Sequence, residues 1–229
     1  MILDSKTIEV MKNFALINPN LLINTGSNIL KTRSASNTLF AIAEVPNSFD
    51  TEIGIYDLNE FLSIIGMIPD ADIRFNDSSA EIISNDGRTV VKYLYAAKNM
   101  LTIPEKSPNV TDPIITLKLG QNDFTALKRA AGIFGFSYLS IRTDENSIVC
   151  EVLDPKNPST NKFSIKLDDR QNGTAEFNFL ISNLANLKFL PLDYTLKFYI
   201  KGQAKIAVFE GEYISYYVGV DRSSTYSLN

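Results

Sequence analysis

A short unit made of a strand, a helix and further strands recurs along this chain of 229 residues. The unit is clearest near residue 180, where Phe177, Phe179 and Ile181 alternate with other side chains as they would in a strand. The apolar residues after Ser182 follow a helical period, and Pro191 ends the predicted helix because proline cannot continue one. Similar helices are predicted to begin near residues 5, 57 and 121, so the unit occurs four times.

The four units pair into two similar domains. The junction after the second helix, 68–75, resembles the junction after the fourth, 190–198. Between the two pairs lies 98–113, a segment with prolines at 104, 108 and 113 that is typical of an extended linker. We therefore predict domains at 1–97 and 114–229, each with two helices packed on antiparallel sheets, which is an α+β fold.

Capping residues and turn residues set the limits of the predicted elements. Asp4 or Ser5 can cap the first helix, and Asp57 begins a capping box at the second. Residues 154–161 are expected to form a long loop and residues 222–229 a polar tail. The predicted helices span 5–17, 57–68, 122–135 and 182–190.

The composition excludes several kinds of enzyme. Histidine is absent, which rules out Ser-His-Asp and Cys-His catalysis and zinc sites built on imidazole. The single cysteine, Cys150, has apolar neighbours and is predicted to be a buried thiol. Paired acids at 168–169 and at Glu210 and Glu212 indicate little, because acids that are close in sequence need not converge on a substrate, and adjacent residues on a strand, such as 168 and 169, point to opposite faces. Glycine-rich phosphate loops are also missing, so we predict no enzyme, no metal site and no cofactor.

Five cations stand out against a formal net charge of −4. Lys6 and Lys12 lie on the outward side of the first predicted helix, and Lys128 and Arg129 on that of the third. Lys188 falls at the edge of the apolar face of the fourth. From the residues alone, the ordinary interpretation is a solvated helix face, and the alternative is a set of helices turned toward phosphate.

Two further groups of side chains allow two interpretations each. Met100, Leu101 and Ile103 are apolar residues in a polar linker, where they either pin the linker to a domain, which we prefer, or border a pocket for a partner. The tyrosines at 213, 216 and 217 could stack on single-stranded bases, but a strand setting favours packing. No apolar run approaches the ~20 residues that cross a bilayer.

Several stretches, taken together and in order, resemble the sliding clamp, or DNA polymerase processivity factor, of T-even-type bacteriophages. The resemblance covers the chain, although 154–161 and the tail match poorly. The matching stretches are Lys12-Asn13-Phe14-Ala15 with Ile17-Asn18, Ile55-Tyr56-Asp57-Leu58-Asn59 with Phe61-Leu62, Phe177-Asn178-Phe179 with Ile181, Asn183, Ala185-Asn186 and Lys188, and Phe209-Glu210-Gly211-Glu212.

This resemblance implies a DNA-clamp fold and a homotrimer, with subunits joined head to tail in a ring around double-stranded DNA. The helices would line the hole, which makes Lys6, Lys12, Lys128, Arg129 and Lys188 the expected DNA-facing residues. The implied partners are the replicative DNA polymerase, a clamp loader and late-transcription factors, in the cytoplasm of an infected bacterium and without a membrane. The alternatives are a non-clamp β-rich module that binds single-stranded nucleic acid and a carboxylate-metal hydrolase.

Overall fold

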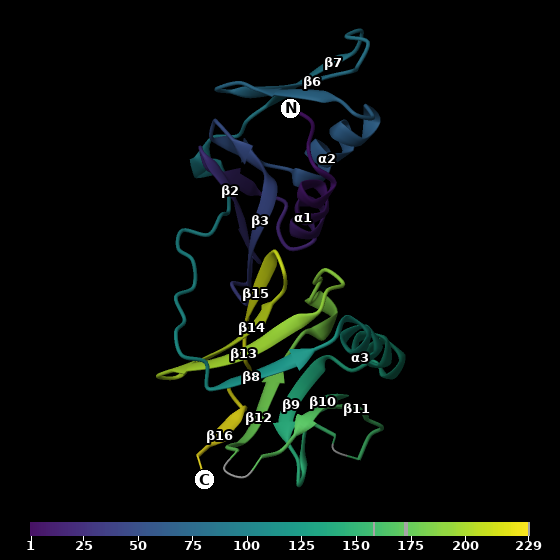
Figure 1. Cartoon of the computed structure of the whole chain (residues 1–229), viewed down its shortest axis with the longest axis vertical. Helices are drawn as coiled ribbons and strands as arrows, with labels where there is room; N and C mark the ends of the chain where they lie inside the picture. The colour runs from purple at the N-terminus through teal and green to yellow at the C-terminus, as the bar shows by residue number, and fades with distance from the viewer. Residues whose placement is uncertain (158, 172–173, 229) are drawn as a thin grey trace. The chain divides into compact units, whose positions relative to one another are not determined.

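The computed structural model describes residues 1–157, 159–171 and 174–228. The chain forms two compact units (Figure 1): Met1–Pro108 with Tyr213–Ser215, and Asn109–Glu212 with Tyr216–Asn229. Both units consist of antiparallel strands with helices packed on them, so the predicted α+β class is confirmed. Among the described residues, no helix is long and apolar enough to cross a membrane.

The first unit contains two α-helices and three groups of paired strands. Its elements are α1 (Ser5–Ala15), β1 (Leu21–Ile23), β2 (Ser27–Arg33), β3 (Leu39–Phe49), β4 (Ile53–Ile55), α2 (Leu58–Met67), β5 (Asp72–Phe75), β6 (Ser79–Ile83), β7 (Val90–Leu94) and the 3-10 turn η1 (Lys98–Met100). β1 pairs with β4, β2 with β3, and β5, β6 and β7 form a sheet in that order. The N–H of Ile73 donates to the Met1 carbonyl at 2.8 Å, so the N-terminal segment lies along β5 while β7 ends the sheet.

Both helices of the first unit start at predicted caps. The carboxylate of Asp4 accepts the N–H of Lys6 at 2.8 Å, and that of Asp57 accepts the N–H of Asn59 at 2.9 Å. These carboxylates satisfy N–H groups that a helix leaves unpaired in its first turn. α1 and α2 lie side by side (Figure 1), and α1 also packs on β3. The fully buried aromatic residues of this unit include Phe14, Phe49 and Phe61.

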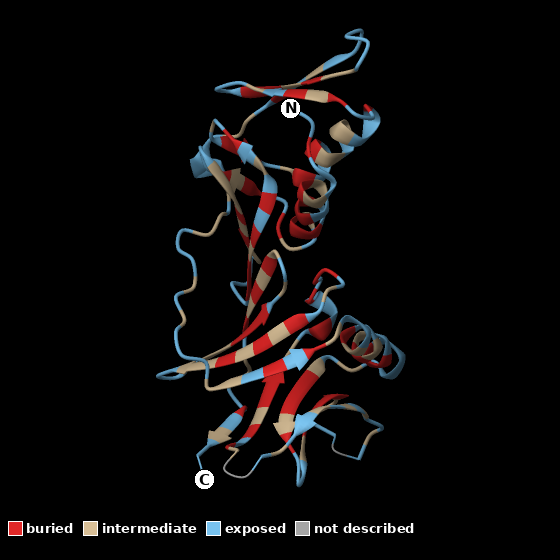
Figure 2. Cartoon of the chain, in the orientation of Figure 1, coloured by how far each residue is buried: buried red, intermediate tan, exposed pale blue. Residues whose placement is uncertain are grey.

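In the described part of the second unit there is one α-helix, which lies between the first two strands of that unit in the sequence. Its elements are β8 (Ile115–Leu119), α3 (Gln121–Phe134), β9 (Tyr138–Thr143), β10 (Ser147–Leu153), β11 (Phe163–Asp169), β12 (Glu176–Ile181), the 3-10 turn η2 (Leu184–Asn186), β13 (Tyr194–Lys201), β14 (Ala204–Glu210), β15 (Ile214–Gly219) and β16 (Thr225–Ser227). One sheet has the order β11-β10-β9-β12-β16, and β13 lies between β14 and β8. Phe179 of β12 stacks on Phe198 of β13 with ring centroids 4.4 Å apart, which joins the two sheets in one core. Figure 2 shows the buried residues along β9, β12 and β13 that form it.

The prediction of a fourth helix over 182–190 is wrong, because this segment contains the three-residue 3-10 turn η2 instead. On an α-helix, side chains two positions apart point to nearly opposite sides. Leu187 and Phe189 are nevertheless only 3% and 7% exposed. One face of a helix could not bury both side chains, so the segment takes a different conformation. Asn183, which precedes η2, has the left-handed conformation at φ 57° and gives the chain a turn there.

Smaller corrections concern element ends. α1 ends at Ala15 rather than at residue 17. The tail predicted at 222–229 contains β16, which pairs with β12 so that Tyr226 lies opposite Phe177. Alternation over three residues is too short to distinguish an edge strand from a polar tail. Of the long loop predicted at 154–161, Pro158 lies outside the described residues.

Gly54 of β4 is predicted to tolerate no side chain. A Cβ added there would lie 2.2 Å from the carbonyl oxygen of Ala96. The N–H of Ala96 also donates to the carbonyl of Gly54 at 2.9 Å, which holds the two backbones close together. We expect Gly54→Ala to lower the free energy of unfolding by about 1–3 kcal/mol, because the backbone must shift. Gly66→Ala is the matched control, since nothing lies within 4 Å of its Cβ and alanine favours a helix. Urea unfolding of both variants checks this, and equal midpoints would contradict it.

Candidate nucleic-acid interface

Two of the predicted DNA-facing cations, Lys12 and Arg129, are exposed on helices. Lys12 lies in the last turn of α1, where a positive charge complements the helix dipole, and Arg129 lies in the middle of α3. Within the described part of the chain, neither residue forms a salt bridge. Their charges are therefore not neutralised by a neighbouring carboxylate and can attract an anion such as phosphate.

Lys6, at the start of α1, is held more closely. Its Nζ lies 4.3 Å from the ring centroid of Tyr213, which is grouped with the first unit. The hydroxyl of Tyr213 donates to the Glu9 carboxylate at 2.8 Å. The Lys6 side chain is half-buried, so part of its charge is directed to this aromatic ring.

The structure brings the other two predicted cations, Lys128 and Lys188, close together. The Nζ of Lys128 donates to the carbonyl of Leu187 at 3.0 Å and lies 5.6 Å from the Phe124 ring centroid. Burial of the half-buried ammonium, and then the neighbouring charge of Lys188, lower the pKa of Lys128. Lys188 is exposed. Two like charges in proximity raise the local positive potential, which suits binding of an anion.

The predicted partner residues Met100, Leu101 and Ile103 differ in their environment. Met100 is 61% exposed, whereas Leu101 and Ile103 are half-buried. Ile103 lines a cavity of about 310 Å³ with Leu22 and Pro104, and its rim carries two lysines and a glutamate. The polar residues of that rim are Lys31, Lys98, Glu105 and Asn24.

Buried amides fasten the start of the linker to the first unit, a feature that sequence reasoning missed. Asn18 donates to the Thr102 carbonyl at 2.8 Å, and the Thr102 N–H donates to the Asn20 side chain at 2.7 Å. The Nε of Arg33 donates to the Ile103 carbonyl at 3.0 Å. In the sequence Asn-Pro-Asn signals only the end of a helix, because the distant backbone that these amides bind cannot be seen there.

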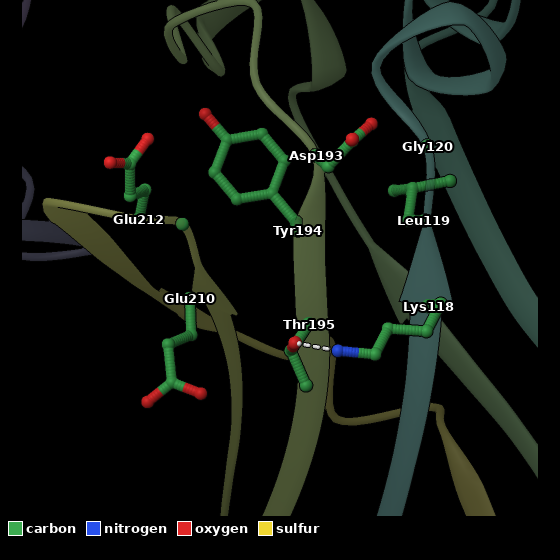
Figure 3. Close-up of a pocket in the computed structure, with 9 residues that line it drawn as sticks. Lys118, Leu119, Gly120, Asp193, Tyr194, Thr195, Glu210 and Glu212 are labelled. Atoms are coloured by element: carbon green, nitrogen blue, oxygen red, sulfur yellow. Dashed lines mark hydrogen bonds between the residues drawn. The ribbon is translucent and has the colours of Figure 1, made fainter.

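A second cavity, of about 620 Å³, contains the paired acids Glu210 and Glu212 together with Asp193 (Figure 3). Figure 3 shows the three carboxylates pointing in different directions rather than at one point. Asp193 accepts the Gln121 N–H at 2.8 Å, and Glu210 pairs with Lys197 at 2.5 Å. No group of three or more His, Cys, Asp or Glu among the described residues could hold a metal ion. Asp193 and Glu210 therefore have structural partners.

The remaining reactive or aromatic candidates are buried or half-buried. Cys150 is fully buried, and burial raises the pKa of its thiol. Tyr216 is fully buried and stacks on Phe189 with ring centroids 4.1 Å apart. Burial also raises the pKa of Tyr217. The tyrosines therefore do not form an open platform for single-stranded bases, and that alternative is not favoured.

Comparisons with known proteins identify the family. The family described as DNA polymerase processivity factor matches residues 4–102, and the gp45 sliding clamp, C terminal, matches residues 116–222. The sliding clamp of Vibrio phage KVP40 is 30% identical over 226 residues, covering 96% of this chain and 99% of that relative. The chain belongs to the sliding clamp family.

Other relatives of this clamp agree. The sliding clamps of Escherichia phage RB69 and Enterobacteria phage T4 are both 29% identical, over 100% of each chain. Among solved structures, A. fulgidus PCNA bound to the C-terminal region of FEN-1 has a TM-score of 0.68 at 14% identity, covering 93% of this chain and 94% of that one. A Helicobacter pylori β clamp has a TM-score of 0.63 at 13% identity, covering 93% of this chain and 63% of that one. These structural matches support the predicted DNA-clamp fold.

The contacts of Asn20 give a prediction about the linker. Asn20→Ala removes the acceptor of the Thr102 N–H, so the chain around Lys98 should open more often. We expect the rate of cleavage after Lys98 by a lysine-specific protease to rise about tenfold relative to cleavage after Lys106. This is the change in the population of the opened linker that the loss of one buried hydrogen bond produces. The exposed Asn59→Ala is the control, and an unchanged cleavage ratio in Asn20→Ala would contradict the role of the amide.

Proposed function

We propose that three copies of this clamp join head to tail in a ring around duplex DNA, and that the ring tethers the replicative DNA polymerase. The observation that supports this most is the presence of exposed cations on α1 and α3 of a chain with a net charge of −4. In this proposal Lys12, Arg129 and Lys188 contact phosphates, with Lys6 and Lys128 beside them. The acidic remainder of the surface repels DNA from the outside of the ring.

Retention by a closed ring explains why a few cations suffice. Contacts between lysine or arginine and phosphate carry no base information, so they attract every sequence alike. Each such contact also adds salt-dependent affinity, and many of them would slow movement along DNA. A ring needs only enough attraction to keep the duplex centred, because the closed chain of subunits prevents escape.

Two different surfaces can form the joint of a head-to-tail ring. In the first unit, β7 ends its sheet and exposes Val90 and Leu94, which are 55% and 68% exposed. In the second unit, β11 ends its sheet, and the adjacent α3 exposes Ile133 at 71%. Unpaired strand edges and exposed apolar residues favour association, and two unlike patches give a heterologous joint. We propose that β7 of one copy joins β11 of the next.

The cavity beside Ile103 is our proposal for the partner pocket. Its apolar part, formed by Leu22, Ile103 and Pro104, suits an apolar side chain of a short peptide segment. Lys31 and Lys98 on the rim suit an acidic neighbour of that side chain. The DNA polymerase is the first proposed occupant. A clamp loader and late-transcription factors are further proposed partners, in the cytoplasm of the infected bacterium.

The DNA-facing surface is tested by charge reversal at its two exposed helix positions. We expect Lys12→Glu with Arg129→Glu to lower affinity for a short duplex about tenfold or more and to flatten its dependence on salt. Fluorescence anisotropy at several salt concentrations measures this. Lys156→Glu with Lys201→Glu makes the same change in charge at other exposed lysines and should have little effect. Equal losses in both double variants would remove Lys12 and Arg129 from the interface.

The joint is tested by the mass in solution. Light scattering over a concentration series should give the mass of three chains for the natural protein, falling on dilution. Val90→Glu with Leu94→Glu should shift the protein toward one chain, because charge replaces the exposed apolar residues of β7. Ile2→Glu, at a residue that is 62% exposed near the opposite edge of the same sheet, is the control. A trimer that persists in the β7 variant would place the joint elsewhere.

A further inference from the structure

The segment 182–190 is held in place without the hydrogen-bond ladder of an α-helix. At its start the N–H of Leu184 donates to the carbonyl of Ser137 at 3.0 Å. At its end the N–H of Leu190 donates to the hydroxyl of Tyr216 at 3.1 Å. Between these points the carbonyl of Leu187 accepts the ammonium of Lys128 at 3.0 Å. In the middle, where Leu187 and Phe189 are buried, the hydrogen bond to α3 therefore depends on one lysine side chain.

Helix α3 directs Lys128 to this carbonyl. Phe124 lies one turn earlier on the same face, and its ring centroid is 5.6 Å from the ammonium. The side chain is half-buried between α3 and η2, which pack against each other. A cation in this position gains a charge-assisted hydrogen bond and an aromatic neighbour, and it loses freedom to reach a ligand in solvent.

The atom that Lys128 binds controls the direction of the next residue. The carbonyl of Leu187 and the N–H of Lys188 belong to one planar peptide group, so fixing the carbonyl fixes the N–H as well. That N–H donates to the carbonyl of Asn186 at 2.9 Å. The Leu187 side chain is buried, whereas that of Lys188 is exposed. This peptide group is therefore where the chain passes from the core to the surface.

We propose that Lys128 is a positioning residue, which binds the Leu187 carbonyl and thereby fixes Lys188 for contact with DNA phosphate. Lys128 then acts through Lys188 and makes no phosphate contact of its own. The part that concerns DNA rests on the proposed function, whereas the attachment of the segment to α3 does not.

Hydrogen–deuterium exchange of the free protein tests the attachment. Lys128→Met keeps the length of the side chain and removes the donor. We expect exchange across 184–190 to rise about tenfold or more, the factor for one charge-assisted hydrogen bond. Lys188→Gln leaves the bond in place and should not change this exchange. Lys128→Arg retains a charged donor and should restore most of the protection, which separates the lost bond from general unfolding.

A double-mutant cycle on duplex affinity tests the positioning role. Lys128→Met and Lys188→Gln should each weaken binding of a short duplex, and the Lys128→Met change should have little further effect in the Lys188→Gln background. Additive losses would overturn the proposal, because they would mean that Lys128 contacts phosphate itself. Unchanged exchange in Lys128→Met would also overturn it.

The two readouts separate this proposal from the proposed function. If Lys188→Gln, Arg129→Gln and Lys12→Gln all leave duplex affinity unchanged, the DNA-facing assignment fails. The exchange experiment still decides in that case whether Lys128 holds the segment. If Arg129→Gln weakens duplex binding while Lys188→Gln does not, the interface stands and the positioning role of Lys128 is refuted.

Discussion

The second unit depends on the packing of Phe189. Its ring stacks on Tyr216 at 4.1 Å, meets the edge of Phe209 at 4.9 Å and lies 5.7 Å from Phe124 of α3. One side chain from an irregular segment thus joins the helix to strands of the sheet. Aromatic rings bury a large area and have preferred mutual geometry, so such a cluster stabilises one arrangement of its neighbours over others. The shape of the segment around Phe189 follows from where this ring must lie.

The surface charge of this region follows from the same packing. Because Leu187 and Phe189 are both buried, the residue between them, Lys188, is directed outward. Lys128 and Lys188 are neighbouring lysines, but the half-buried Lys128 binds a backbone carbonyl, whereas the exposed Lys188 is directed to solvent. In the first unit, Lys6 and Lys12 show a similar contrast, since an aromatic ring engages Lys6 while Lys12 is exposed. Local packing, rather than the number of cations, decides which charges can meet a ligand.

The sequence predicted features that depend on local pattern and missed those that depend on distant contacts. The caps Asp4 and Asp57, three of four helices and the strand around Phe179 follow from periodicity and turn residues, and the structure agrees with them. The segment 182–190 was misjudged because its apolar spacing fits a helix, while its burial on several sides depends on the aromatic cluster. The amides of Asn18 and Asn20 were missed for a related reason, because their partner Thr102 is more than 80 residues away. Similarly, helical periodicity placed Lys128 on an outer face and could not show the carbonyl that it binds.

The burial of Cys150 has a practical consequence. The chain has a single cysteine, which is fully buried, and burial raises its thiol pKa, so the thiolate that reacts with maleimides is scarce. A cysteine introduced on the surface would therefore react selectively while the native thiol stays in place. Fluorophores could be attached at chosen positions without altering the core, and the distances between them in the assembled protein could be followed one molecule at a time.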